Sequence, residues 1–286
     1  MKAAHPMLKP DLSQWVGKTQ TQTGRVGAEI AQMLHATIGA PDSTAPVAGD
    51  TLPSLWHWTA FTPKASMGKI TQDGHPQRGD FLPPVHLPRR MWAGGAVTFH
   101  EPLHVEEPLT QVSTITSVDE KSDTMVFVTL THEVYAKESL ALSEVQNIVY
   151  LEIPDTFAPP RARPVPDAPV FSDRIAMSEA LLFRYSAATF NAHRIHYDLA
   201  YAREVEKYPG LVVHGPLQAT VLLQAAERHS GRAPAHFSYR GVHPLFHDDD
   251  LHVMGFDATD HGMELCTGIP GGHQGQSASV TWRDDR

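Results

Sequence analysis

The sequence predicts an α+β fold in which an apolar helix precedes an antiparallel sheet, twice over. In each half of the chain, a segment with apolar residues at helical spacing is followed by segments rich in Val, Thr and Ile. A proline-rich stretch separates the two halves. Because an apolar helix must bury its surface, we expect each sheet to wrap around the helix of its own half.

The first predicted domain covers residues 1–152. Its helical pattern places apolar residues at positions 26, 30, 33, 34 and 38, and Gly39 can end the helix. A long loop rich in proline and glycine, residues 62–88, follows; structureless loops of this length are usually functional or mobile, and this one could cover a pocket. Strands are then expected at 95–103, 109–120, 124–136 and 139–152.

Residues 153–170 carry six prolines, each of which fixes φ and removes a backbone donor, so an extended linker is expected. The second predicted domain covers residues 171–286. Helices are expected at 177–189, at 198–210 with Asp198 as cap and Gly210 as terminator, and at 214–231. Strands are expected at 235–246, 250–259, 262–269 and 277–282.

Composition excludes several classes of function. The chain has 23 basic and 32 acidic residues and a net charge of −9, so nucleic acid is not an expected partner. Its single cysteine, Cys266, allows no internal disulfide and suits a reducing compartment. The N-terminal residues lack the apolar core of a signal peptide, and the most apolar run, 211–226, is interrupted by polar residues. We expect a soluble cytoplasmic protein without membrane contact.

The stretch "FNAHRIHYD", residues 190–198, is the most informative segment. It places Asn191, His193 and His196 close together, which suits a metal site, a catalytic site or a polar helix entry. Zinc requires three or four converging ligands, and neither a cysteine pair nor a His-Glu-x-x-His pattern accompanies this stretch. In the histidine- and aspartate-rich stretch 243–252, residues 247–250 are more typical of a solvated hairpin turn between two strands. No metal is therefore expected.

The motif also carries a family resemblance. "FRYSAATFNAHRIHYD" and "YPGLVVHGPLQATVLL" in the second half, with "LPRRMWAGGAVTFHEPL" in the first, resemble MaoC-like hot-dog hydratases. More closely, these segments resemble type 2 hydroxyacyl-thioester dehydratases and the hydratases of mesaconyl-C4-CoA and itaconyl-CoA. The resemblance implies a double hot-dog fold with a catalytic C-terminal half and an N-terminal half that has lost the catalytic residues and contributes to the substrate pocket. It implies reversible addition of water to an enoyl thioester, with coenzyme A as part of the substrate and no other cofactor.

The family's catalytic pair is an aspartate and a histidine five residues later. Carried over, the histidine is His196, whereas Asn191 stands at the aspartate position and cannot exchange a proton at neutral pH. One histidine can perform both proton transfers if its pKa suits the working pH, and Asn191 could orient the water. The N–H of Gly215, at the start of a helix, could hold the enolate oxygen. The structural alternatives are a helix-start histidine and a turn asparagine.

Several further residues are candidates for contact with the substrate. Arg89, Arg90 and Trp92 form either an exposed basic edge or a site for the free carboxylate of a dicarboxylic acyl chain. His193 and His214 are expected to support His196 and the helix start. The lesser candidates for thioester or phosphate contacts are Arg184 and Tyr208.

The favoured reaction is the hydration of itaconyl-CoA or mesaconyl-C4-CoA to citramalyl-CoA. Three alternatives stay open: a 3-hydroxyacyl-thioester dehydratase of fatty-acid type, a non-catalytic acyl-thioester binding protein, and a hot-dog thioesterase. The binding protein is suggested by Asn191, while a thioesterase would need a carboxylate where Gln218 and Gln224 stand. By analogy with other hot-dog proteins, a homodimer is expected.

Overall fold

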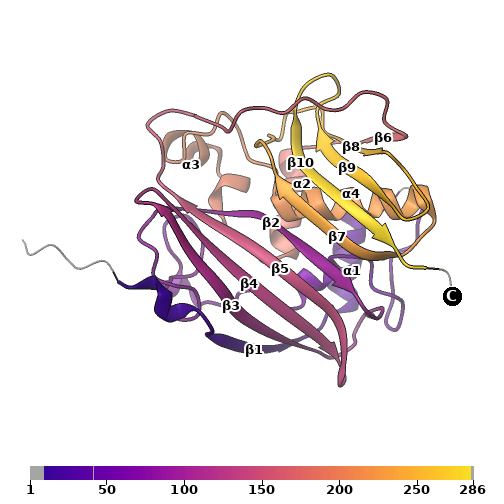
Figure 1. Ribbon diagram of the computed structural model, residues 1–286, viewed down its shortest axis with the longest axis horizontal. Helices are drawn as coiled ribbons and strands as arrows, with labels where there is room; N and C mark the ends of the chain where they lie inside the picture. Colours follow the sequence, from indigo (N-terminus) through magenta and orange to yellow (C-terminus); the bar gives the residue numbers. More distant parts are fainter. Residues whose placement is uncertain (1–9, 41, 285–286) are drawn as a thin grey trace, which may run out of the picture.

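The computed structural model describes residues 10–40 and 42–284. Its described strands form one ten-stranded antiparallel sheet in the order β1-β3-β4-β5-β2-β7-β10-β9-β8-β6 (Figure 1). The strands are β1 (Thr19–Gly24), β2 (Arg89–Phe99), β3 (Leu109–Ser122), β4 (Met125–Ala136), β5 (Ser139–Leu151), β6 (Phe171–Arg174), β7 (Pro234–Gly241), β8 (His252–Phe256), β9 (Gly262–Gly268) and β10 (Gln274–Trp282). The α+β class predicted from the sequence is confirmed.

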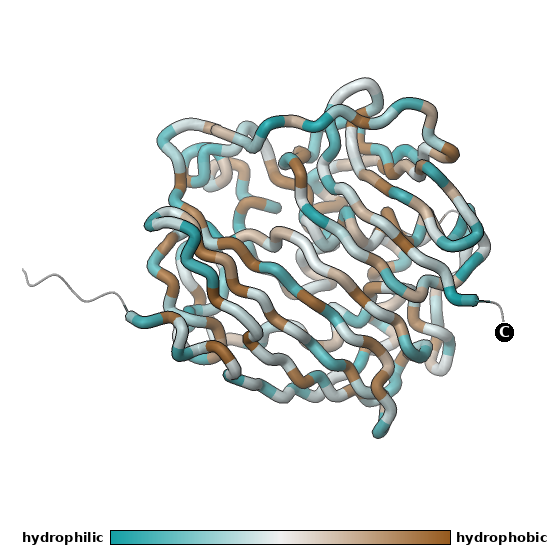
Figure 2. The backbone as a smooth tube through the Cα atoms, viewed as in Figure 1, coloured by the Kyte–Doolittle hydropathy of each residue, from teal (hydrophilic) through white to brown (hydrophobic). Residues whose placement is uncertain are grey.

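The sheets of the two halves join edge to edge. Strand β2 of the first half pairs antiparallel with β7 of the second, with Ala96 opposite Ser238. Each half therefore covers an edge that would otherwise expose unpaired backbone groups. Hydrophobic and hydrophilic residues alternate along β3, β4 and β5 (Figure 2), because one face of these strands is buried and the other faces outward.

Helix α4 (Gly215–Ser230) is the central helix of the second half and contacts β7, β8, β9 and β10. Pro216 lies in its first turn, and Gly231, with φ of 68°, ends it. Helix α1 (Ala28–Ile38) packs against α2 (Glu179–Ala188), so the helices of both halves share one core on one side of the sheet (Figure 1).

The remaining described helices are short. They are η1 (Leu12–Trp15), η2 (Trp56–Thr59), η3 (Met67–Lys69), η4 (Arg194–His196) and α3 (Leu199–Glu204). Asp198 caps α3 as expected, since its carboxylate accepts a hydrogen bond of 3.0 Å from the N–H of Tyr201. The helix nevertheless ends at Glu204 and not at Gly210. Lys207 adopts a left-handed φ of 64°, which no continuing helix allows.

The proline-rich segment 153–170 contains no helix and no strand, and crosses from the end of β5 to β6 (Figure 1). Strand β6, which pairs with β8, was not expected from the sequence. The expected strand pieces on either side of 247–250 are not hairpin partners, because β9 and β10 lie between β7 and β8. In the described part of the chain, no helix is both long and apolar enough to cross a membrane.

Candidate active site

The motif 190–198 forms the connection between α2 and α3. Asn191 occupies a turn, and its side-chain Oδ1 accepts a hydrogen bond of 2.9 Å from the backbone N–H of His193. This bond matches the turn role that asparagine often takes. The carboxamide thereby fixes the entry into η4, in which His196 lies.

His196 is buried, and its ring has a defined tautomer. Its Nδ1 lies 2.7 Å from the carbonyl oxygen of Val212. A carbonyl only accepts, so Nδ1 carries the hydrogen and Nε2 presents a lone pair. Burial, together with the neighbouring rings of His214 and His193, lowers the pKa of His196 well below its usual value. The ring is therefore neutral at neutral pH and can accept a proton there.

His214 links the motif to the start of α4. Its ring stacks on His196 with centroids 3.6 Å apart, and its Nε2 lies 2.8 Å from the hydroxyl of Ser186. Burial, followed by the proximity of His193, lowers the pKa of His214 to about 3. His214 is the N-cap of α4, so the stack places His196 beside the first turn of that helix, which begins at Gly215. The N–H groups of a first turn have no acceptor within the helix. His196, His214 and Gly215 are thus brought together.

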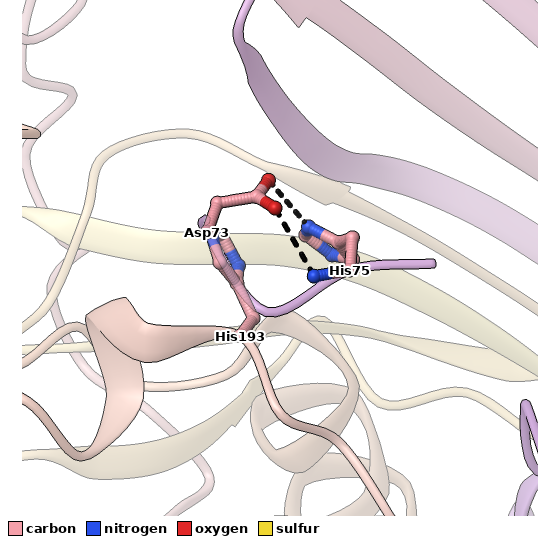
Figure 3. Close-up of side chains that lie close together, drawn as sticks. All are labelled: Asp73, His75 and His193. Atoms are coloured by element: carbon pink, nitrogen blue, oxygen red, sulfur yellow. Dashed lines mark hydrogen bonds and ion pairs between the residues drawn. The ribbon is translucent and has the colours of Figure 1, made fainter. Parts of the chain in front are cut away.

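The first half contributes two residues that were not expected from the sequence. Asp73 and His75 lie on the loop between η3 and β2, next to His193 (Figure 3). Asp73 Oδ2 accepts a hydrogen bond of 2.8 Å from His75 Nδ1, and the ring centroids of His75 and His193 are 4.2 Å apart. Four imidazoles, on His75, His193, His196 and His214, therefore form a continuous row.

The protonation states of Asp73 and His75 follow from their surroundings. Burial alone would raise the pKa of Asp73, but the hydrogen bond and charge of His75 and the hydroxyl of Thr71 bring that pKa below its usual range. Burial lowers the pKa of His75 to about 3; the bond to Asp73 opposes this, while His193 and Arg90 add to it. Asp73 is thus an anion beside a neutral imidazole whose Nδ1 donates to it.

Asp73, His75 and His193 also have the residue types of a metal site. Their potential ligand atoms lie within 4.8 Å of one another, and they are the one such group of three found in the described residues. However, Oδ2 of Asp73 already accepts from His75 Nδ1, and Oδ1 accepts from the hydroxyl of Thr71. Hydrogen bonding therefore accounts for the carboxylate without an ion.

The histidines of the stretch 243–252 do not converge on a common point. His243 Nδ1 lies 3.0 Å from its neighbour's carbonyl oxygen, and His252 Nδ1 lies 2.9 Å from the hydroxyl of Ser172. His247 Nε2 lies 3.6 Å from a carboxylate oxygen of Glu179. The expectation that this chain binds no metal stays a prediction.

Arg89 is not part of an exposed basic edge, so that interpretation is wrong for it. Its Nε donates a hydrogen bond of 2.8 Å to Glu206 Oε2, and its guanidinium lies 4.7 Å from the ring centroid of Tyr208. Both charged partners are buried, which commits the guanidinium to the protein. The other oxygen of Glu206, Oε1, faces His193 Nε2 at 3.7 Å. Arg89 and Tyr208 are therefore linked to His193 through Glu206.

The other candidates for substrate contact lie in different surroundings. Arg90 is half-buried, makes no hydrogen bond or ion pair with the described residues, and lies close enough to His75 to affect its pKa. Trp92 packs edge-on against Trp58, and its backbone oxygen would lie 3.6 Å from a Cβ at Gly215. Arg184 is exposed on α2. Of the predicted arginines, Arg90 is the one with an uncommitted charge near the histidine row.

Sequence reasoning missed Asp73, His75, Ser186 and Glu206. The first two stand in the loop 62–88, where "DGH" carries turn chemistry and titratable groups side by side, a signal that was available. Glu206 belongs to a stretch of alternating charges that is typical of a solvated helix face, and gave no such signal.

Comparison with known proteins shows which family the chain resembles. Residues 55–247 match the family described as hydroxyacyl-thioester dehydratase type 2. The chain is 42% identical over 96% of its length to mesaconyl-C(4)-CoA hydratase of Chloroflexus aurantiacus, of which the match covers 99%.

Two solved structures have a similar fold. A MaoC-like dehydratase from Phytophthora capsici superposes with a TM-score of 0.71 at 14% identity, over 96% of this chain and 98% of that one. A Mycobacterium tuberculosis protein described as having a double hot-dog fold superposes with a TM-score of 0.54 at 12% identity, over 93% and 96%. The double hot-dog fold expected from the sequence is confirmed.

Proposed function

Because the chain belongs to the type 2 hydroxyacyl-thioester dehydratase family, we propose that it adds water reversibly to the C=C bond of a branched C5 dicarboxylic enoyl-CoA. The chain is a hydro-lyase. Mesaconyl-C4-CoA is the favoured substrate, since the relative that is 42% identical over nearly the full length acts on it by name. Itaconyl-CoA is the second choice, and citramalyl-CoA the product.

The observation that carries the proposal is the tautomer of His196. With Nδ1–H donating to Val212, Nε2 holds its lone pair in a fixed direction. In the hydration direction, Nε2 takes one proton from water while the hydroxide oxygen bonds to the β-carbon. The resulting imidazolium then gives that proton to the α-carbon. Water is added, the thioester is kept, and His196 returns to its neutral state.

The surroundings of His196 favour the second of the two proton transfers. Because burial lowers the pKa of the ring, the neutral form is available to accept a proton from water, and the imidazolium, once formed, is a strong acid that transfers its proton to carbon readily. The enolate oxygen would accept a hydrogen bond from the N–H of Gly215 at the start of α4, where the helix dipole favours negative charge. Such a donor contributes roughly 3 kcal/mol in a site without water.

Arg90 is the proposed contact for the free carboxylate of the substrate. Its half-buried guanidinium, without an ion-pair partner in the described residues, lies near His75 and hence near the histidine row. A carboxylate would neutralise this charge through charge-assisted hydrogen bonds. An unbranched fatty acyl chain offers no such group, which favours the dicarboxylic substrate over the dehydratase of fatty-acid type.

Assay of the purified protein with mesaconyl-C4-CoA, itaconyl-CoA, crotonyl-CoA and a long-chain enoyl-CoA tests the proposal. We expect the absorbance of the conjugated thioester to fall fastest with a C5 dicarboxylic substrate, without release of free thiol. Thiol release would instead indicate a thioesterase. No change with any substrate would favour the non-catalytic binding protein, and a preference for the long chain would favour the fatty-acid dehydratase.

An acyl-CoA is the proposed partner, with no cofactor beyond it. A homodimer in the cytoplasm is proposed on analogy with other hot-dog proteins and on composition. Light scattering at several protein concentrations would test the dimer, and fractionation of the source cells would test the location.

A further inference from the structure

The backbone of the loop between η3 and β2 is in direct contact with the backbone of the motif 190–198. A Cβ placed at Gly74, whose φ is 94°, would overlap the backbone carbonyl of Ala192. The carbonyl of Asp73 accepts a hydrogen bond of 2.9 Å from the N–H of Arg194, whose guanidinium also donates to Gln72 at 3.1 Å. The two halves are therefore joined here by main-chain contact, which leaves little freedom for the loop.

The loop is itself a tight turn that presents two side chains. The N–H of Thr71 donates to the carbonyl of His75 at 2.8 Å, and the N–H of Gly74 donates to Thr71 at 3.0 Å. Asp73 Oδ1 accepts from the N–H of His75 at 3.1 Å, while Oδ2 accepts from its ring Nδ1. These bonds hold Asp73 and His75 in one arrangement beside His193.

We propose that Asp73 and His75 complete the hydration site from the first half of the chain, in place of the carboxylate that the motif lacks at Asn191. His75 Nε2 accepts a hydrogen bond from the attacking water and aims its oxygen at the β-carbon. Asp73 is the positioning residue, because its carboxylate fixes the hydrogen of His75 on Nδ1. This role rests on the proposed hydration of an enoyl thioester, and His196 still performs the proton transfers.

Three observations support this assignment. Donation from Nδ1 to Asp73 leaves Nε2 as the acceptor, on the opposite side of the ring. The side chain of His75 keeps 20% of its surface exposed within an otherwise enclosed position, so a water can reach it. The carboxamide oxygen of Asn191 is already engaged by the backbone of His193.

The charges around His75 keep its Nε2 able to accept. The groups that face it are Asp73 on its own loop, His193 and His196 on the motif, and Arg90 on β2. Only Asp73 is an anion, and burial outweighs its effect, so the ring stays neutral at neutral pH. A neutral acceptor orients water without removing a proton from it.

The test compares Asp73→Asn with Asp80→Asn, the same substitution at an exposed position of the same loop. We measure kcat and KM for mesaconyl-C4-CoA, and the tautomer of His75 by ¹⁵N NMR. For Asp73→Asn we expect kcat to fall by at least about tenfold with KM within about threefold, and His75 to lose its single tautomer. Asp80→Asn should match the wild type in all three.

A kcat for Asp73→Asn within about twofold of the wild type, with an altered His75 tautomer, would overturn the role while leaving the hydratase proposal intact. A wild type inactive on every enoyl-CoA would overturn both.

A second variant tests the same role in case Asp73→Asn does not fold. His75→Ala should lose at least about tenfold in kcat and regain activity when imidazole is added. Full activity of His75→Ala without imidazole, in a folded protein, would also overturn the role.

Discussion

The rings of His196 and His214 stack face to face, with centroids 3.6 Å apart and planes inclined by 20°. A proton on either ring would place a positive charge against the face of its neighbour at a buried position, which is costly. Both rings are therefore held neutral. The stack also joins the motif to the first turn of α4, so that the base and the helix start keep a fixed relation.

Loss of the His196 imidazole should abolish both proton transfers. For His196→Ala we expect kcat to fall by about a thousandfold, on the scale of a general acid–base group, in a protein whose folded state is checked by circular dichroism. The exposed His261→Ala is the matched control and should retain wild-type turnover. Near-normal turnover of His196→Ala in a steady-state assay would remove the residue from the mechanism.

Stability should depend on pH through the buried neutral histidines. The pKa of His214 is about 3 in the folded protein against 6.5 ordinarily, so between these values the unfolded state binds more protons. The free energy of unfolding therefore falls as the pH falls from 6.5 toward 3, by about 2 kcal/mol at pH 5 for one such histidine. In urea titrations, the free energy of unfolding of His214→Asn should decrease between pH 7 and pH 5 by about 2 kcal/mol less than that of the wild type.

The exposed His261→Asn serves as the control for this measurement, because its site lies in solvent. Its stability should change between pH 7 and pH 5 as much as that of the wild type. If His214→Asn and the wild type lost the same free energy over this interval, the ring of His214 would not be held neutral in the folded protein.

Elements with local signals were predictable from the sequence. Gly39 and Gly231 end α1 and α4 as expected, and Asp198 caps α3, because these terminators act on backbone groups a few residues away. The family motif located His196 and the start of α4. The pairing of β2 with β7 had no local signal, because either strand could have been an edge.

The rest of the site depends on contacts between distant parts of the chain. Asp73 and His75 lie in the site because the backbone of Gly74 contacts that of Ala192. No spacing in the sequence indicates this contact. Glu206 follows α3 in a run of charged residues, which suggests an exposed position. It is buried because it pairs with Arg89 on β2, a contact between distant parts of the chain. Side-chain direction at such positions is decided by tertiary packing.

Arg89 and Glu206 form a buried ion pair between the halves, and removing one partner should leave an uncompensated charge. We expect Arg89→Met or Glu206→Leu to lower the free energy of unfolding by about 3–5 kcal/mol, and the double variant Arg89→Met/Glu206→Leu to lose less than the sum of the two single variants. The exposed pair Arg174–Asp250 should show a much smaller effect in the same double-mutant cycle. Strict additivity at Arg89 and Glu206 would rule out their coupling.

Arg90 should discriminate substrates by their charge. A hydrogen-bonded ion pair with the free carboxylate contributes about 1.5–3 kcal/mol, so Arg90→Met should raise KM for mesaconyl-C4-CoA by about tenfold or more. Crotonyl-CoA lacks this carboxylate, and its KM should change little. Arg184→Met, on the exposed face of α2, is the comparison: a contact with the coenzyme A phosphates would raise both KM values equally. Because both substrates share the coenzyme, only the ratio of their KM values reports on the carboxylate, and an unchanged ratio in Arg90→Met would assign that carboxylate to another group.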